Sequence, residues 1–188
     1  MYGIVNKAIE ELLTAHGGIE LWHAVCEEAG VEPLSFIAQE SYPDCITFGL
    51  VQAASKKLGM SPHEVLVKFG EHWSIYTGQA GYGHLFKMLG EDLMTFLDNL
   101  PELHDHVAHI FPDMKMPHFE TERVDPQTIR VLYRSERTGL APMVLGLLEG
   151  MAKIYNTQVR VSHSRQLDAS FDADEFFVTL TTEAHAIT

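Results

Sequence analysis

Residues 93–110 constrain the fold more than any other stretch of the sequence. Their apolar residues recur every three or four positions, which is the spacing of the buried face of a helix. The positions of this face are Leu93, Leu97, Leu100, His104 and Val107. His104 occupies a place where a leucine is expected, whereas His106 and His109 lie well off the face. The pattern therefore predicts one inward-facing histidine, and a core histidine hydrogen-bonded to a carbonyl group is the ordinary alternative.

Pro101 divides this stretch into two helices. Proline disrupts a helix interior but is well tolerated in a first turn. We therefore expect one helix to end near Asn99 and the next to begin with Pro101 in its first turn. His104 then lies early in the second helix, between Leu100 and Val107.

Composition and charge exclude several classes of protein. The 188 residues suit a single domain, 46% of them are hydrophobic, and the net charge of -13 disfavours binding to nucleic acid or an anionic membrane. Cys26 and Cys45 have neither metal nor redox spacing. The first residues lack the pattern of a signal peptide, and no apolar run is long enough to span a bilayer. These features predict a cytoplasmic protein.

The two halves of the chain have different hydrophobic periods. The N-terminal half has helical spacing, with glycines at the ends of the segments. Its expected helices are residues 4–13, 19–29, 46–58, 62–76 and 85–89, with a glycine-rich loop at 78–83. The C-terminal half alternates polar and apolar residues, which is typical of strands. Its expected elements are strands 119–124, 128–134, 158–163 and 174–181 and a helix at 140–155. An α+β fold follows, with a helical N-terminal lobe and a C-terminal lobe of antiparallel sheet and one packed helix.

Three polar side chains stand at alternate positions where the second strand ends. Tyr133, Ser135 and Arg137 leave the same face of an extended chain. All three are hydrogen-bond donors, and a guanidinium can bind a carboxylate through two parallel bonds. The trio is therefore a candidate clamp for the carboxylates of a buried ligand. The alternative is a polar strand edge with a surface arginine.

Together these features resemble the haem-nitric oxide/oxygen binding family, or H-NOX family, which includes the haem domain of soluble guanylate cyclase. The resemblance rests on the inward His104, the segment from Phe111-Pro112 to Pro117, the Tyr-x-Ser-x-Arg motif and the apolar helix that follows. The Met-Tyr-Gly-Ile-Val-Asn start, the Leu-His-Asp-His run around His104 and residues 139–146 are also similar to the family. The likeness covers residues 1 to about 180 of a single domain, 1–188, and leaves the tail at 181–188 outside.

The resemblance implies a haem b between the two lobes. By resemblance, His104 is the proximal ligand of the iron, Tyr133, Ser135 and Arg137 hold the haem propionates, and Pro117 presses on the macrocycle and distorts it. The residues that would line the distal side are Ile4, Trp73, Met143, Val144 and Leu148. Each of these apolar residues also fits ordinary core packing.

The same resemblance predicts which gas the site holds. Bound O₂ carries partial negative charge and needs a hydrogen-bond donor, whereas nitric oxide and carbon monoxide need none. Family members that hold O₂ carry a tyrosine on the distal helix, but residues 140–151 contain none and Tyr155 lies too far along. We therefore expect a sensor of nitric oxide that also binds carbon monoxide. The indole N–H of Trp73 is the one donor that favours the alternative, an O₂-binding haem sensor.

The resemblance also implies how binding becomes a signal. Nitric oxide weakens the bond opposite to it, which would release the helix bearing His104 and relax the haem. The glycine-rich stretch 78–83 would then absorb part of the motion. The 188 residues contain no output domain, so we expect a separate partner, such as a histidine kinase or a diguanylate cyclase.

Two other classes of function remain as alternatives. An enzyme would require a metal site built from His104, His106, His109 and Asp105, but their helical angles scatter them, so we expect no enzyme. A haem-free interaction module would keep the fold and lose the cofactor. The colour of the purified protein distinguishes the two from a haem sensor.

Overall fold

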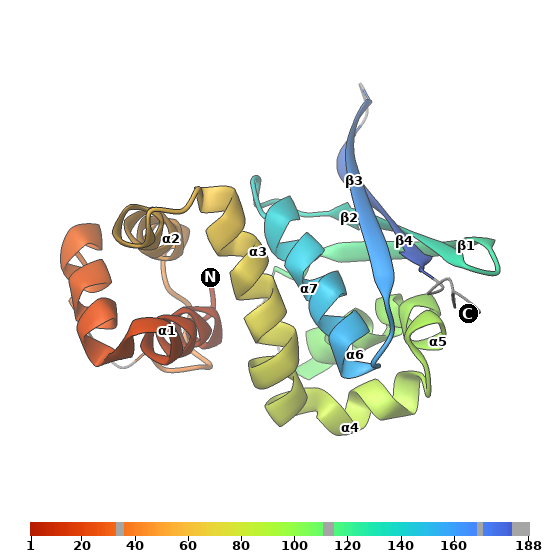
Figure 1. Cartoon of the computed structure of the whole chain (residues 1–188), viewed down its shortest axis with the longest axis horizontal. Helices are drawn as coiled ribbons and strands as arrows, with labels where there is room; N and C mark the ends of the chain where they lie inside the picture. Colours follow the sequence, from red (N-terminus) through yellow and green to blue (C-terminus); the bar gives the residue numbers. More distant parts are fainter. Residues whose placement is uncertain (33–35, 111–114, 169–170, 182–188) are drawn as a thin grey trace, which may run out of the picture.

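The helical half of the chain begins with three helices that pack together. In the computed structural model, which describes residues 1–32, 36–110, 115–168 and 171–181, these are α1 (Gly3–Ala29), α2 (Asp44–Leu58) and α3 (Pro62–His72) (Figure 1). The sequence pattern predicts a break at Gly17-Gly18, and α1 bends there. Gly18 has a φ of 74°, which only glycine adopts readily, so the two predicted helices are joined by a kink.

The start of α3 follows a capping box. The Ser61 hydroxyl accepts the backbone N–H of Glu64, and the Glu64 carboxylate accepts the backbone N–H of Ser61 at 2.8 Å. Pro62 follows at the first helical position. This exchange satisfies two N–H groups that would otherwise be unpaired. It stabilises the start of the helix at the predicted position.

The prediction of a loop at residues 78–83 was wrong. The chain continues from α3 into a π-helix, η1 (Trp73–Gly78), and then directly into α4 (Gln79–Leu89). Glycine costs a helix only about 1 kcal/mol per residue. Burial of Phe86 offsets that cost, because its ring packs edge-on against Phe96 at 5.5 Å and over Gly78. Hydrophobic burial therefore outweighs local propensity here.

The predicted break at Pro101 is confirmed. Helix α5 (Leu93–Asp98) ends before Asn99, and α6 (Leu100–Ile110) carries Pro101 in its first turn. The side-chain amide of Asn99 donates to the carbonyl oxygen of Leu89 at 2.7 Å, which fixes the junction. His106 and His109 are exposed, as the helical angles predict, and His104 is not.

The C-terminal half forms an antiparallel sheet with one helix packed on it. Its strands are β1 (His118–Asp125), β2 (Thr128–Arg134), β3 (Val159–Asp168) and β4 (Phe171–Leu180), in the order β1-β2-β4-β3. Helix α7 (Ala141–Ile154) connects β2 to β3. The α+β prediction is confirmed, while the predicted irregular segment at Phe111-Pro112 lies outside the described residues.

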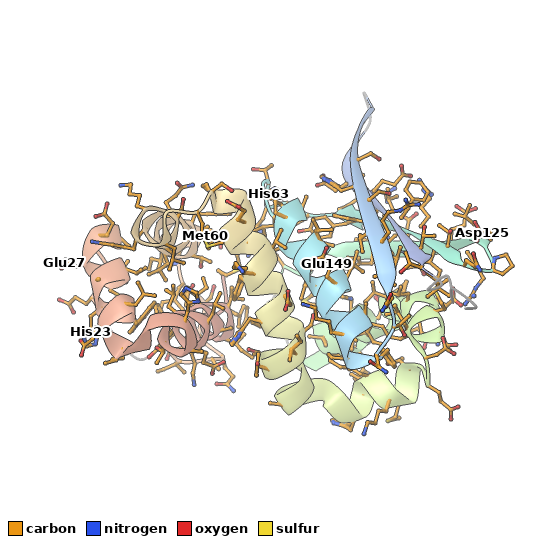
Figure 2. The ribbon with its side chains drawn as sticks, viewed as in Figure 1. His23, Glu27, Met60, His63, Asp125 and Glu149 are labelled. Carbon is orange, nitrogen blue, oxygen red and sulfur yellow. The ribbon has the colours of Figure 1, made fainter. Side chains whose placement is uncertain are left out.

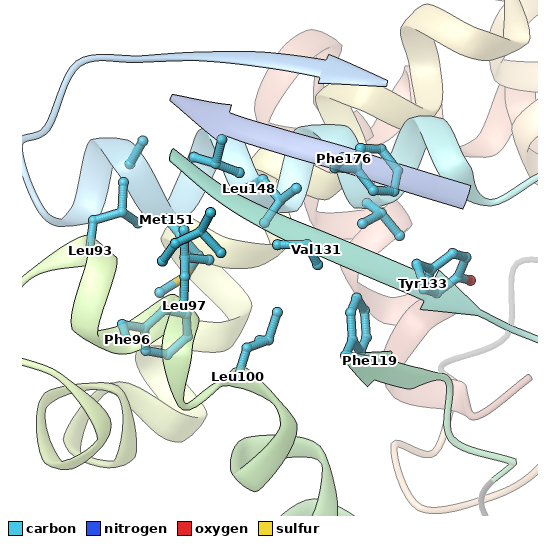
Figure 3. Close-up of a cluster of buried hydrophobic side chains, with 14 of the residues drawn as sticks. Leu93, Phe96, Leu97, Leu100, Phe119, Val131, Tyr133, Leu148, Met151 and Phe176 are labelled. Atoms are coloured by element: carbon cyan, nitrogen blue, oxygen red, sulfur yellow. The ribbon is translucent and has the colours of Figure 1, made fainter. Parts of the chain in front are cut away.

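Two hydrophobic cores meet along α3 and α7. One core belongs to α1, α2 and α3. The other lies between the sheet, α5 and α7, and includes Phe96, Leu97, Val131 and Phe176 (Figure 3). The α3 and α7 backbones touch, because a Cβ added to Gly146 would lie 1.9 Å from the Val67 carbonyl oxygen. The close approach places the end of α3 and η1 against both lobes.

The molecule is elongated along the direction that joins these two cores. Figure 2 shows His23 and Glu27 of α1 at one end and Asp125, where β1 meets β2, at the other. Within the described part of the chain, no helix combines the length and the apolarity needed to cross a membrane.

Candidate functional site

A cavity of about 290 Å³ lies where the helical lobe meets the sheet lobe. Its wall is almost entirely apolar and comes from α1, the turn at residues 36–40, η1, α4 to α7 and β1. The lining residues are Ile4, Val5, Ala38, Gln39, Trp73, Ser74, Gly78, Phe86, Phe96, Leu97, Leu100, Leu103, His104, Val107, Met116, Phe119, Leu147, Leu148 and Met151. An apolar cavity with a few polar groups in its wall suits a largely apolar ligand.

His104 is the one histidine among the described residues that line the cavity. Its Nδ1 lies 3.2 Å from the Leu100 carbonyl oxygen, which can only accept, so Nδ1 is the donor. Nε2 then keeps its lone pair. Burial lowers the pKa of His104, although the Leu100 carbonyl and Asp105 raise it, so the ring is neutral near pH 7. Metal-binding histidines commonly donate their second nitrogen to a carbonyl in this way.

An aromatic contact connects His104 to the polar motif. The ring of Phe119 packs on His104 with centroids 4.4 Å apart and on Tyr133 with centroids 5.3 Å apart. Tyr133 is 5% exposed. Burial raises the pKa of its phenol, and the hydrogen bond between the Tyr133 and Ser135 side chains lowers it in part. These ring contacts connect α6 through β1 to the end of β2. His104 and Tyr133, the first residue of the Tyr-x-Ser-x-Arg motif, therefore pack on the same phenylalanine ring.

The Tyr-x-Ser-x-Arg motif does not continue as extended strand. Strand β2 ends at Arg134, and the Ser135 hydroxyl accepts the backbone N–H of Arg137 at 3.1 Å in a tight turn. The Arg137 guanidinium donates from Nε to the Asp44 carboxylate at 2.9 Å and from Nη1 to the Lys115 carbonyl oxygen at 3.0 Å. The prediction of one continuous face therefore fails at Arg137, although the three residues remain close.

Asp44 joins this arginine to the start of the chain. The α-ammonium group of Met1 bonds both the Asp44 carboxylate and the Tyr42 carbonyl oxygen, the latter at 2.6 Å. These contacts, with the Met1 ammonium first and Arg137 after it, hold the pKa of Asp44 below its ordinary value of 3.8. These three charged groups therefore connect the helical lobe to the turn that follows β2.

Four of the predicted site residues line the cavity, namely Ile4, Trp73, His104 and Leu148. The other six lie outside its wall: Pro117, Tyr133, Ser135, Arg137, Met143 and Val144. Met143 packs with the helical core, and Val144 is buried in the sheet core. Pro117 directly follows the lining residue Met116. The roles predicted for all ten residues remain predictions.

Two hydroxyl groups, those of the lining residue Ser74 and of Tyr155 at the end of α7, already have partners. The Ser74 hydroxyl donates to the Leu147 carbonyl oxygen at 3.0 Å. The Tyr155 hydroxyl donates to the carbonyl oxygens of Phe86 at 3.0 Å and Gly90 at 3.1 Å, and Tyr155 is not a lining residue. The cavity wall that the described residues form contains no tyrosine.

Sequence reasoning missed Asp44, Phe119 and Gln39. Asp44 and Gln39 follow irregular chain, so no periodicity marks them, and their importance depends on contacts with residues far away in sequence. Phe119 was predicted only as a strand residue, although its alternation with polar neighbours already indicated an inward side chain. Contacts of this kind are set by the packing of the two lobes.

Comparison with known proteins identifies the family. The family profile described as haem-NO-binding matches residues 2–163. The chain belongs to the haem-NO-binding, or H-NOX, family. Domains of this family bind haem and gas ligands such as nitric oxide, and they act as sensor domains that signal to partner domains or proteins, without catalytic activity of their own.

The relatives of this H-NOX domain include soluble guanylate cyclases. It is 29% identical to soluble guanylate cyclase gcy-35 of Caenorhabditis elegans over 95% of its length and 26% identical to soluble guanylate cyclase 89Db of Drosophila melanogaster over 81%. The alignments cover 26% and 23% of those relatives, so the chain spans about a quarter of their length.

Solved structures share the fold. An H-NOX protein from S. oneidensis in the Fe(II)NO state is 21% identical, with a TM-score of 0.83 over 97% of this chain and 100% of that one. An oxygen-binding H-NOX domain related to soluble guanylate cyclases, in its oxygen complex, is 20% identical, with a TM-score of 0.81 over 97% and 96%. Both likenesses show that this chain has the same fold as these proteins.

Proposed function

We propose that this domain is a haem-based sensor of nitric oxide, with His104 as the protein ligand of a ferrous haem b. The observation that carries the proposal is the His104 imidazole, whose Nδ1 is bonded to Leu100 while Nε2 remains available beside an apolar cavity. The residues present fit the cofactor, since apolar walls suit the porphyrin and a neutral imidazole suits the iron. Bound haem would supply an iron with one position open for a gas.

The carboxylates of the haem need donors at the cavity edge. Arg137 uses Nε and Nη1 for Asp44 and Lys115, and Nη2 has no partner among the described contacts. That nitrogen, together with the hydroxyls of Tyr133 and Ser135, would hold a propionate. Pro117, next to the lining residue Met116, would press on the macrocycle.

Nitric oxide and carbon monoxide are the gases that this wall suits best. A donor must stabilise O₂, and the hydroxyls of Ser74 and Tyr155 are already bonded to backbone carbonyls. Ile4, Trp73 and Leu148, with Met143 and Val144 behind the wall, would make the distal side. O₂ sensing is the second candidate function, and the Trp73 indole N–H is the observation that favours it.

The signal would travel through α6. This short helix carries His104 and is held at its start by Asn99 and Leu100, so freeing the imidazole would leave α6 able to shift against β1. A separate protein, such as a histidine kinase or a diguanylate cyclase, would receive the signal, and the cytoplasm is the compartment in which we place both.

A cavity variant tests the ligand assignment. We expect His104→Gly to lose haem during purification and to regain a Soret band when haem and free imidazole are added together, because the small molecule replaces the missing ring. The matched control is His106→Gly, which removes an exposed histidine from the same helix and should retain haem without imidazole. Full haem retention by His104→Gly without imidazole would contradict the assignment.

A further inference from the structure

Besides the His104 imidazole, a polar side chain lies at the mouth of the cavity. Gln39 lines the cavity but its side chain is exposed, so it stands where the cavity meets solvent. Among the contacts of the described residues, its amide has no hydrogen-bond partner. Gln39 therefore offers two N–H donors to whatever occupies the opening.

The turn that carries Gln39 is held in place by the start of α1. The backbone N–H of Ile4 donates to the Ala38 carbonyl oxygen at 3.1 Å, and that of Gly3 donates to the Glu40 carbonyl oxygen at 2.8 Å. A Cβ on Gly3 would lie 2.0 Å from the Ile37 carbonyl oxygen, so the two segments are in contact. A fixed backbone reduces the entropy that an amide loses when it binds a ligand.

The same turn is tied to the corner that holds Arg137. The Tyr42 hydroxyl accepts the backbone N–H of Ile37 at 3.0 Å, and the Tyr42 carbonyl accepts the Met1 ammonium group. That ammonium group bonds Asp44, which in turn bonds Arg137. The turn that carries Gln39 is therefore connected to Arg137 through Tyr42, Met1 and Asp44.

The other side-chain hydrogen-bond donors of the cavity wall are already bonded to carbonyl oxygens or packed against the protein. Ser74 donates to Leu147 and His104 to Leu100, while Trp73 packs against the helical core. A porphyrin with two carboxylates directs its charged edge to solvent, because burying a carboxylate without partners is costly. Among the side chains of the cavity wall, Gln39 is therefore the donor best placed to meet a carboxylate.

We propose that the Gln39 side-chain amide donates a hydrogen bond to a haem propionate and so slows the loss of haem. The inference rests on the proposed function and extends the carboxylate-binding set beyond the Tyr-x-Ser-x-Arg motif. A carboxylate at position 39 would repel the propionate, so substitution by glutamate should have a larger effect than truncation to alanine.

The rate of haem transfer from the ferric holoprotein to excess apomyoglobin tests this. Gln39→Ala should lose haem about 3- to 10-fold faster than the unsubstituted protein, which is less than a buried hydrogen bond to a charged group would give, because position 39 is exposed to water. Gln39→Glu should lose haem faster still. The matched control is Glu40→Gln, which changes charge on the same turn at a residue outside the cavity wall and should stay within about twofold.

Three results would overturn the inference while the protein still binds haem. One is an unchanged transfer rate in both Gln39 variants with a normal circular dichroism spectrum. Another is a slower haem loss in Glu40→Gln that equals the acceleration in Gln39→Glu and disappears at high salt. That pattern would mean that both substitutions act through long-range electrostatic repulsion. The third is a shifted C–O stretching frequency of the CO complex with unchanged haem loss, which would place the amide beside the gas. A protein that binds no haem at all would contradict the proposed function instead.

Discussion

At the scale of single residues, a few hydrogen bonds decide what the site can do. The bond from His104 to Leu100 leaves the lone pair on Nε2, and the hydroxyl groups of Ser74 and Tyr155 are already bonded to backbone carbonyl oxygens. His104 was predictable because it interrupts a regular apolar stripe. Its partner was not singled out, because a carbonyl oxygen leaves no mark in a sequence.

A tyrosine placed in the cavity wall should confer O₂ binding. Leu147 lines the cavity from α7, and Leu147→Tyr would supply the missing donor. We expect the ferrous variant to give a stable oxy spectrum in air and to release O₂ about 10- to 100-fold more slowly than the parent, the usual effect of a hydrogen bond to a charged acceptor. Stopped-flow absorption measures the release rate.

The control for this substitution is Leu147→Phe, which has the same ring without the hydroxyl. It should behave like the parent in air. An oxy complex equally stable in the phenylalanine variant would mean that cavity shape, and not the donor, controls O₂ binding.

Removing the charge of Asp44 should weaken the protein in a pH-dependent way. The Met1 ammonium group and Arg137 depress the pKa of Asp44, so its stabilising contribution is present above 3.8 and is lost as the pH falls below that value. Asp44→Asn should unfold about 1 kcal/mol more easily near neutral pH, since the pair is partly exposed. Thermal melts between about pH 7 and pH 3 should show the two proteins converging in acid.

Glu91→Gln provides the comparison, because Glu91 is exposed and has no bonded partner in the described structure. Its melting curve should follow that of the parent at every pH. A difference between Asp44→Asn and the parent that persists unchanged in acid would show that Asp44 acts through something other than its charge.

At the scale of helices and strands, sequence patterns located most elements that bury one face. Strands β1 and β2, α7 and the break before Pro101 follow from the positions of apolar and capping residues. Strand β3 continues to Asp168, beyond its predicted end at 163, and β4 begins at Phe171, before its predicted start at 174. The prediction failed at residues 78–83, where glycines indicated a loop. Packing of Phe86 over Gly78 decides the structure there, and local propensity alone does not carry that information.

The seam between α3 and α7 should tolerate no side chain at Gly146. An added Cβ meets the Val67 carbonyl oxygen at 1.9 Å and other backbone atoms within 3.0 Å, so the helices would have to separate. We expect Gly146→Ala to lower the free energy of unfolding by about 2–4 kcal/mol, as measured by urea denaturation.

Gly49→Ala is the matched control for helix propensity. Gly49 lies in α2 with nothing within 4 Å of an added Cβ. The substitution should stabilise the protein by about 0.5–1 kcal/mol, because alanine favours a helix over glycine. If Gly146→Ala were stabilising to the same extent, the helices could not be in backbone contact.

At the scale of the whole molecule, the chain builds two cores and leaves an apolar cavity between them. The sequence predicted the two lobes and the inward histidine. It did not predict which distant segments close the cavity, such as the turn at 36–40, because that depends on how the lobes dock. A ligand that occupies this cavity touches both lobes, so a change at His104 can alter how they pack.

The absorption spectrum of the reduced protein tests the central claim most directly. Protein purified from cells supplied with iron is recorded without gas, in air and under nitric oxide. The account predicts a red protein with a strong Soret band that is the same in air as without gas, apart from slow oxidation, and that shifts under nitric oxide. A colourless protein, or a stable oxy spectrum in air, would contradict it.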